Sequence, residues 1–165
     1  MLFDIPNPLG LSEIDSLLPS TEEEWYAENE DRWRILKSSD TTPPPPHFQD
    51  AFSQLFQDTT DYIHRYSEYG GYIMICSLLF SILDAHRLSK FPMVAVDFAK
   101  LDVALKNWQG IWDADPKSHI SGPSSPFGAI AFNASVVYRA ARVRRIKDFS
   151  RYLRVKRLLI VELNR

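Results

Sequence analysis

The chain has a single cysteine, Cys76, among its 165 residues. One cysteine excludes an intramolecular disulfide, and the four histidines are scattered, so no Cys/His group has the spacing of zinc ligands. Glycine-rich phosphate-binding motifs are also missing, and no serine sits in a strained nucleophile turn. The sequence therefore predicts a protein that is not an enzyme, with no catalytic, cofactor-binding or metal-binding residue in this chain.

Extended structure and long apolar segments are equally scarce. No stretch alternates apolar and polar residues with a period of two, and no Asn-Gly or Asp-Gly hairpin turn occurs. The longest apolar run, 72–83, has twelve residues, whereas a membrane-spanning helix needs about 20. With no signal peptide at its start, the chain is expected to be soluble and intracellular.

Apolar side chains recurring at spacings of three and four are abundant instead. Hydrophobic residues make up 45% of the chain and aromatic residues 13%, which is enough for a substantial core. We predict an all-α fold, an irregular bundle of about five or six helices in one domain over residues 1–165. The expected helices cover about 21–37, 48–66, 72–88, 96–112, 127–146, and a last one from Asp148 or Ser150 to about Leu163.

A proline-rich segment interrupts this pattern at residues 38–46, "SSDTTPPPP". Four consecutive prolines favour an extended polyproline II path, which predicts a stiff linker inside the domain. Docking of these prolines into an aromatic groove of a partner is the alternative interpretation.

An acidic stretch contains two tryptophans, Trp25 and Trp33, among six carboxylates between residues 22 and 31. A spacing of eight places both indoles on one side of a single helix, which Ser20 or Thr21 would cap. We expect these indoles to pack onto the core as structural anchors. Trp108 and Trp112, four residues apart in a clean apolar stripe, are expected to act in the same way.

The net charge of −2 conceals a strong division along the chain. Residues 139–165 hold ten Lys/Arg and two acids, and residues 1–138 hold nine bases and nineteen acids. We predict a charged surface at Arg139, Arg142, Arg144 and Arg145. It would pack beside the acidic body of the same chain, with the acidic N-terminal third as one candidate contact, or face nucleic acid or another acidic partner.

Several segments in fixed order resemble the C-terminal part of the fungal-specific transcription factor regulatory domain. Leu18-Pro19 with Trp25, Ala27 and Trp33 is similar to that family's "LP…W.A…W" element. Further similar segments are "ALKNWQGIW" (104–112), "SPFGAIAFNASVVYRAARVR" (125–144) and "DFS" (148–150). The resemblance covers about residues 11–154 and points to the branch of the family that carries Cys-His zinc fingers.

This resemblance implies a nuclear regulator of transcription. The chain would be a partial regulatory domain that binds the rest of the factor, a second copy or a coregulator. Zinc and DNA contacts would belong to a finger module that is absent from these residues, and no ligand residue carries over. Two alternatives stay open. One is direct nucleic-acid binding by the basic C-terminal helices. The other is a small helical ligand-binding domain or enzyme, which a pocket joining His64 or His86 to paired carboxylates would support.

Overall fold

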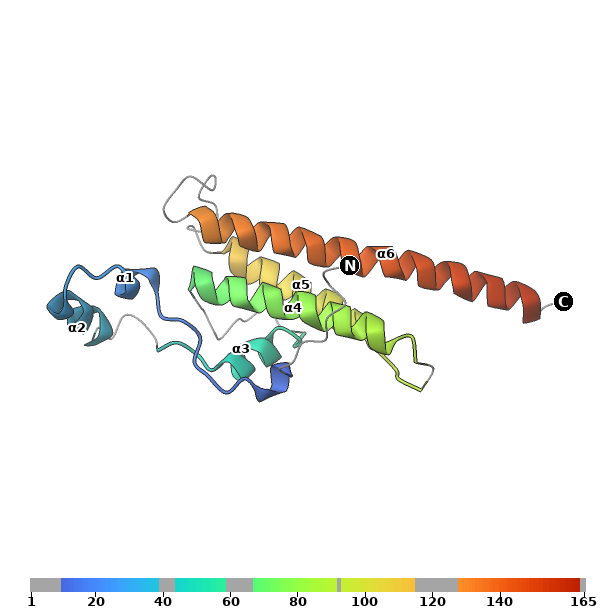
Figure 1. Ribbon diagram of the computed structural model, residues 1–165, viewed down its shortest axis with the longest axis horizontal. Helices are drawn as coiled ribbons and strands as arrows, with labels where there is room; N and C mark the ends of the chain where they lie inside the picture. The colour runs from blue at the N-terminus through green and yellow to red at the C-terminus, as the bar shows by residue number, and fades with distance from the viewer. Residues whose placement is uncertain (1–9, 39–43, 59–66, 92, 115–127, 164–165) are drawn as a thin grey trace.

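The computed structural model describes residues 10–38, 44–58, 67–91, 93–114 and 128–163 (Figure 1). Within these ranges the protein is helical and has no strand, which confirms the all-α prediction. The elements are a 3-10 turn η1 (Leu11–Glu13) and the helices α1 (Glu22–Trp25), α2 (Glu30–Ser38), α3 (Phe48–Gln54), α4 (Glu68–Leu88), α5 (Phe98–Asp113) and α6 (Gly128–Leu163).

Helices α4, α5 and α6 form the body of the molecule. Figure 1 shows α4 and α6 running in the same direction and α5 running in the opposite direction, and α4 packs directly against both α6 and α5. Their facing sides bury one continuous apolar cluster, and the largest fully buried side chains in it are Trp108, Phe48, Leu55, Met74, Ile75, Leu78 and Ile82. Three buried alanines of α6, spaced three and seven residues apart (Ala131, Ala134 and Ala141), let that helix approach its neighbours closely.

Helix α4 begins earlier than the sequence indicated. Gly70 and Gly71 were expected to separate two elements, yet both lie in its first turn and are buried. The reason is Ser67, whose Oγ accepts a hydrogen bond from the Gly70 N–H at 3.1 Å and caps the helix. The same hydroxyl donates to the Pro19 carbonyl at 3.1 Å, so the cap also holds the N-terminal segment.

The length and composition of α4 are sufficient for it to cross a membrane, and 39% of its most apolar stretch is buried within the structure. The twelve-residue apolar run had not indicated this. The central helix of a helical bundle meets the same two criteria, so they identify α4 only as the most apolar helix among the described residues.

The segment before α1 pairs with the segment before α3. Leu18 N–H donates to the Pro46 carbonyl and Phe48 N–H donates to the Ser16 carbonyl, both at 2.9 Å, which makes an antiparallel bridge between Leu17 and His47. The described end of the proline-rich segment is therefore tied to the N-terminal segment instead of acting as a free spacer. Residues 39–43 of the predicted linker lie outside the described residues.

The predicted helix over 21–37 is wrong in its continuity, because it is two helices, α1 and α2. Tyr26 ends α1, and Asn29 starts α2 by accepting a hydrogen bond from the Arg32 N–H at 2.9 Å through its Oδ1. Asparagine at this position favours a new helix start over helix continuation.

Two further predicted boundaries are wrong. The predicted helix over 48–66 gives way to a turn after Gln54, and residues 59–66 lie outside the described part of the chain. The predicted break at Asp148 or Ser150 does not occur, because α6 runs unbroken for 36 residues, about 54 Å. A capping residue does not end a helix when no glycine or proline accompanies it and its neighbours are strong helix formers.

Candidate interaction surface

Trp108 and Trp112 anchor α5 in the core, as the sequence predicted. They are 1% and 7% exposed, and their rings stack with centroids 5.1 Å apart. Trp108 also stacks on Tyr138 of α6 at 5.2 Å and donates from Nε1 to the Gly71 carbonyl of α4 at 2.9 Å. A single indole therefore contacts both neighbouring helices, and its polar atom is satisfied where no water reaches it.

Asn107 attaches the same helix to α3. Its Nδ2 donates to the carbonyls of Leu55 and Gln57, at 2.9 and 2.8 Å, and the side chain is buried. These carbonyls follow the end of α3, where no helical N–H is available to them. The sequence did not single out Asn107, because an asparagine inside an apolar helix gives no signal of its partner.

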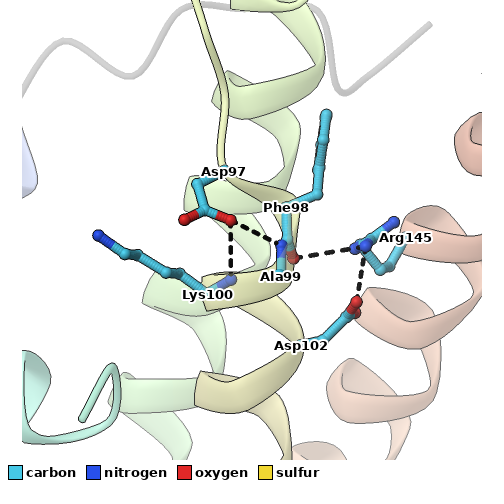
Figure 2. Close-up of polar contacts among 6 residues, drawn as sticks. All are labelled: Asp97, Phe98, Ala99, Lys100, Asp102 and Arg145. Carbon is cyan, nitrogen blue, oxygen red and sulfur yellow. Dashed lines mark hydrogen bonds and ion pairs between the residues drawn. The ribbon is translucent and has the colours of Figure 1, made fainter. Parts of the chain in front are cut away.

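Near its N-terminal end, α5 is joined to α6 by Arg145 (Figure 2). Arg145 Nη2 lies 2.6 Å from Asp102 Oδ2 and 3.4 Å from the Phe98 carbonyl oxygen, and the guanidinium lies 5.0 Å from the centre of the Phe98 ring. Asp97 caps α5 through hydrogen bonds from the N–H groups of Ala99 and Lys100. The Arg145 side chain is only 11% exposed, and that of Asp102 is 55% exposed. Arg145 therefore serves mainly to connect α5 with α6 and contributes little positive charge to the surface.

The four predicted arginines thus divide between two roles. Arg139, Arg142 and Arg144 are exposed on α6, as expected of charged surface residues, and the Arg142 guanidinium lies 5.8 Å from the centre of the Tyr138 ring. Arg145 departs from the prediction, because it is partly buried and pairs with a carboxylate of α5 and not with the acidic N-terminal third.

The outward side of α6 also carries large apolar residues. Phe132, Val136, Val143 and Ile146 are exposed, and together with Arg139 they recur at alternating spacings of four and three. That spacing produces a single stripe along a helix, of the kind that receives a second helix. We call this stripe, with Arg142 beside it, the α6 outer face. Four exposed apolar side chains in register form a surface that a monomer would ordinarily cover.

The acidic aromatic segment, residues 22–38, lies at one end of the molecule (Figure 1). The prediction that its indoles anchor it to the core is wrong, because Trp25 is 72% exposed and Trp33 is 43% exposed. Tyr26 and Ile35 are exposed as well. The segment is held internally by an ion pair between Lys37 Nζ and Glu24 Oε2 at 3.5 Å. The residue that reaches the core near this segment is Leu18, whose side chain is buried in the main cluster.

The remaining candidate groups form no chemical site among the described residues. No group of three or more His, Cys, Asp or Glu is placed there to hold a metal ion. His86 packs its ring 5.0 Å from that of Phe98, and His64 lies outside the described part. Burial raises the pKa of the Cys76 thiol, while a hydrogen bond with Tyr72 acts in the opposite direction.

A comparison of this chain with protein-family models, with curated proteins and with solved structures finds no match.

Proposed function

We propose that this chain is a regulatory interaction domain of a fungal transcription factor, acting by helix-mediated binding to other protein surfaces. The observation that carries the proposal is the α6 outer face, where exposed Phe132, Val136, Val143 and Ile146 accompany cationic side chains on a helix already fixed to the core. Such a face has the apolar centre and charged margin of a protein-binding surface.

The regulatory context comes from the sequence resemblance and not from the surface. Two of the segments that carry the resemblance fall on helices of the body: 104–112 lies within α5, and 128–144 forms the first half of α6. Any DNA recognition would be supplied by a zinc-finger module outside these residues, and the factor would act in the nucleus.

Tethering the chain to a promoter tests this function. The chain is fused to a heterologous DNA-binding module in a fungal cell, and the reporter transcript is compared with that of the module alone. We expect a change in transcript level that V136E/V143E abolishes, because two carboxylates on the α6 outer face oppose apolar docking. The matched control is K100Q/K106Q, which changes the net charge equally on the exposed side of α5. An unchanged transcript with the wild-type fusion would refute the proposed function.

Direct nucleic-acid binding is the second candidate, favoured by the exposed Arg139 and Arg142. Phosphate contacts are strongest at low ionic strength, so a DNA-binding titration in about 0.05 M salt is the most sensitive test. We expect no binding there. Binding that weakens steeply with added salt and is lost in R139E/R142E would replace the interaction proposal with nucleic-acid recognition.

A further inference from the structure

We propose that the α6 outer face binds the acidic aromatic segment of a second copy of this chain, in a head-to-tail contact. This inference rests on the proposed function, since it names a partner for the same surface. The two surfaces are defined by residues already described: the stripe from Phe132 to Ile146 on α6, and residues 22–38 with exposed Trp25, Tyr26, Trp33 and Ile35.

The two surfaces have opposite charge. Residues 128–146 contain four arginines and no acid, and one of these arginines, Arg145, is engaged with Asp102. Residues 22–38 contain six carboxylates and three cations. Each surface combines bulky apolar groups with a net charge, positive on the α6 outer face and negative on the acidic aromatic segment, so their contact would bury aromatic area while pairing unlike charges.

The arrangement of the chain points to a second copy and not to a contact within one molecule. Along the longest axis, α1 and α2 lie beyond the N-terminal end of α6 and not alongside that helix (Figure 1). The acidic aromatic segment is held near its position by Leu18, which is buried and whose N–H donates to the Pro46 carbonyl. The segment therefore does not lie along the α6 outer face of its own chain.

Charge also selects the mode of association. A symmetric pairing of two α6 outer faces would place Arg139 and Arg142 of one copy against the same residues of the other, which is unfavourable. Pairing unlike surfaces avoids this repulsion and produces a heterologous contact. Because the dimer then retains one unused α6 outer face on one copy and one unused acidic aromatic segment on the other, association can continue beyond a dimer.

Complementation between two variants tests the proposal. The face variant is V136E/V143E, and the segment variant is W25A/W33A. All four positions are exposed, so far-UV circular dichroism should show both variants folded like the wild type. Sedimentation velocity of the full chain over a range of concentrations then measures association. K100Q/K106Q is the control for the face variant, and F80A/F91A, which removes two exposed rings elsewhere, is the control for the segment variant.

We expect the wild type and both controls to associate with increasing concentration. Each test variant alone should lose about tenfold or more in association constant, because large aromatic anchors dominate such contacts. An equimolar mixture of the face and segment variants should form a one-to-one dimer that does not grow further. In that dimer the intact segment of the face variant occupies the intact face of the segment variant. Added salt should weaken the dimer.

Three results would overturn the inference: a wild-type chain that stays monomeric at all concentrations, a segment variant that associates like the wild type, or two variants that fail to complement each other. The second result would indicate symmetric pairing of α6. If self-association fails but the promoter effect and its loss in V136E/V143E persist, the proposed function stands with a different partner. If complementation succeeds and the promoter effect is absent, the proposed function fails and the self-association remains.

Discussion

The two tryptophan pairs of this chain differ in burial. Trp108 and Trp112 are 1% and 7% exposed, whereas Trp25 and Trp33 are 72% and 43% exposed. The first pair lies in a helix whose neighbouring turns supply further apolar residues on the same side. The second pair lies in two short helices that bury no apolar side chain. An indole therefore becomes a core residue when the whole face of its helix is apolar. A helical spacing between two indoles is not sufficient to predict that they are buried.

The largest expected loss of stability is at Trp108, in the buried tryptophan pair. Trp108→Ala should lower the free energy of unfolding by about 3–5 kcal/mol, because it leaves a cavity between three helices and removes the hydrogen bond to the Gly71 carbonyl. Denaturant-induced unfolding measures the change, and Trp108→Phe, which retains a ring, should cost less. A loss below about 1 kcal/mol for Trp108→Ala would show that the α5 tryptophans are not the anchors described here.

The second largest expected loss of stability is at Asn107, the residue next to Trp108. Asn107→Ala should lower the free energy of unfolding by about 1–3 kcal/mol, because two carbonyls after α3 lose their donor. Asn133→Ala, on the exposed side of α6, is the matched control and should change it by less than about 0.5 kcal/mol. Equal effects at the two positions would argue against the attachment of α3 to α5.

A smaller effect is expected where α5 and α6 meet through charge. In a double-mutant cycle, Arg145→Met and Asp102→Asn should show a coupling of about 0.5–1 kcal/mol, modest because Asp102 is half exposed to solvent. Thermal unfolding of the four proteins measures it. The coupling should fall in about 1 M salt, where the Debye length is near 3 Å. A coupling unaffected by salt would mean that the contact with the Phe98 ring outweighs the ion pair.

The smallest expected change in stability is at the exposed tryptophan pair, Trp25 and Trp33. Trp25→Ala and Trp33→Ala should each change the free energy of unfolding by no more than about 0.5 kcal/mol, because neither indole is buried in the core. The same denaturant titration used for Trp108 provides the measurement. A loss above about 2 kcal/mol at either position would restore the sequence-based interpretation of these residues as structural anchors.

The helices of the body could be predicted from periodicity, because their apolar stripes repeat over several turns. The stripe through Leu101, Leu105, Trp108 and Trp112 located α5 to within two residues at either end. The short helices could not be predicted in this way, since α1 has four residues and depends on contacts outside itself. The candidate surface was predicted in part: Arg139, Arg142 and Arg144 were expected at the surface, but the exposure of the apolar residues interleaved with them was not predicted.

By itself, the sequence determined an all-helical chain with a tryptophan-anchored helix and a basic C-terminal part, because helix periodicity and charge are local properties of the residues. Only the tertiary structure decided which apolar residues are covered. Leu18 enters the core while Trp25 does not, and Ala131 is buried in the core while its neighbour Phe132 is exposed. The physical reason is that burial depends on which surface lies opposite a side chain, and that surface is supplied by residues distant in the sequence.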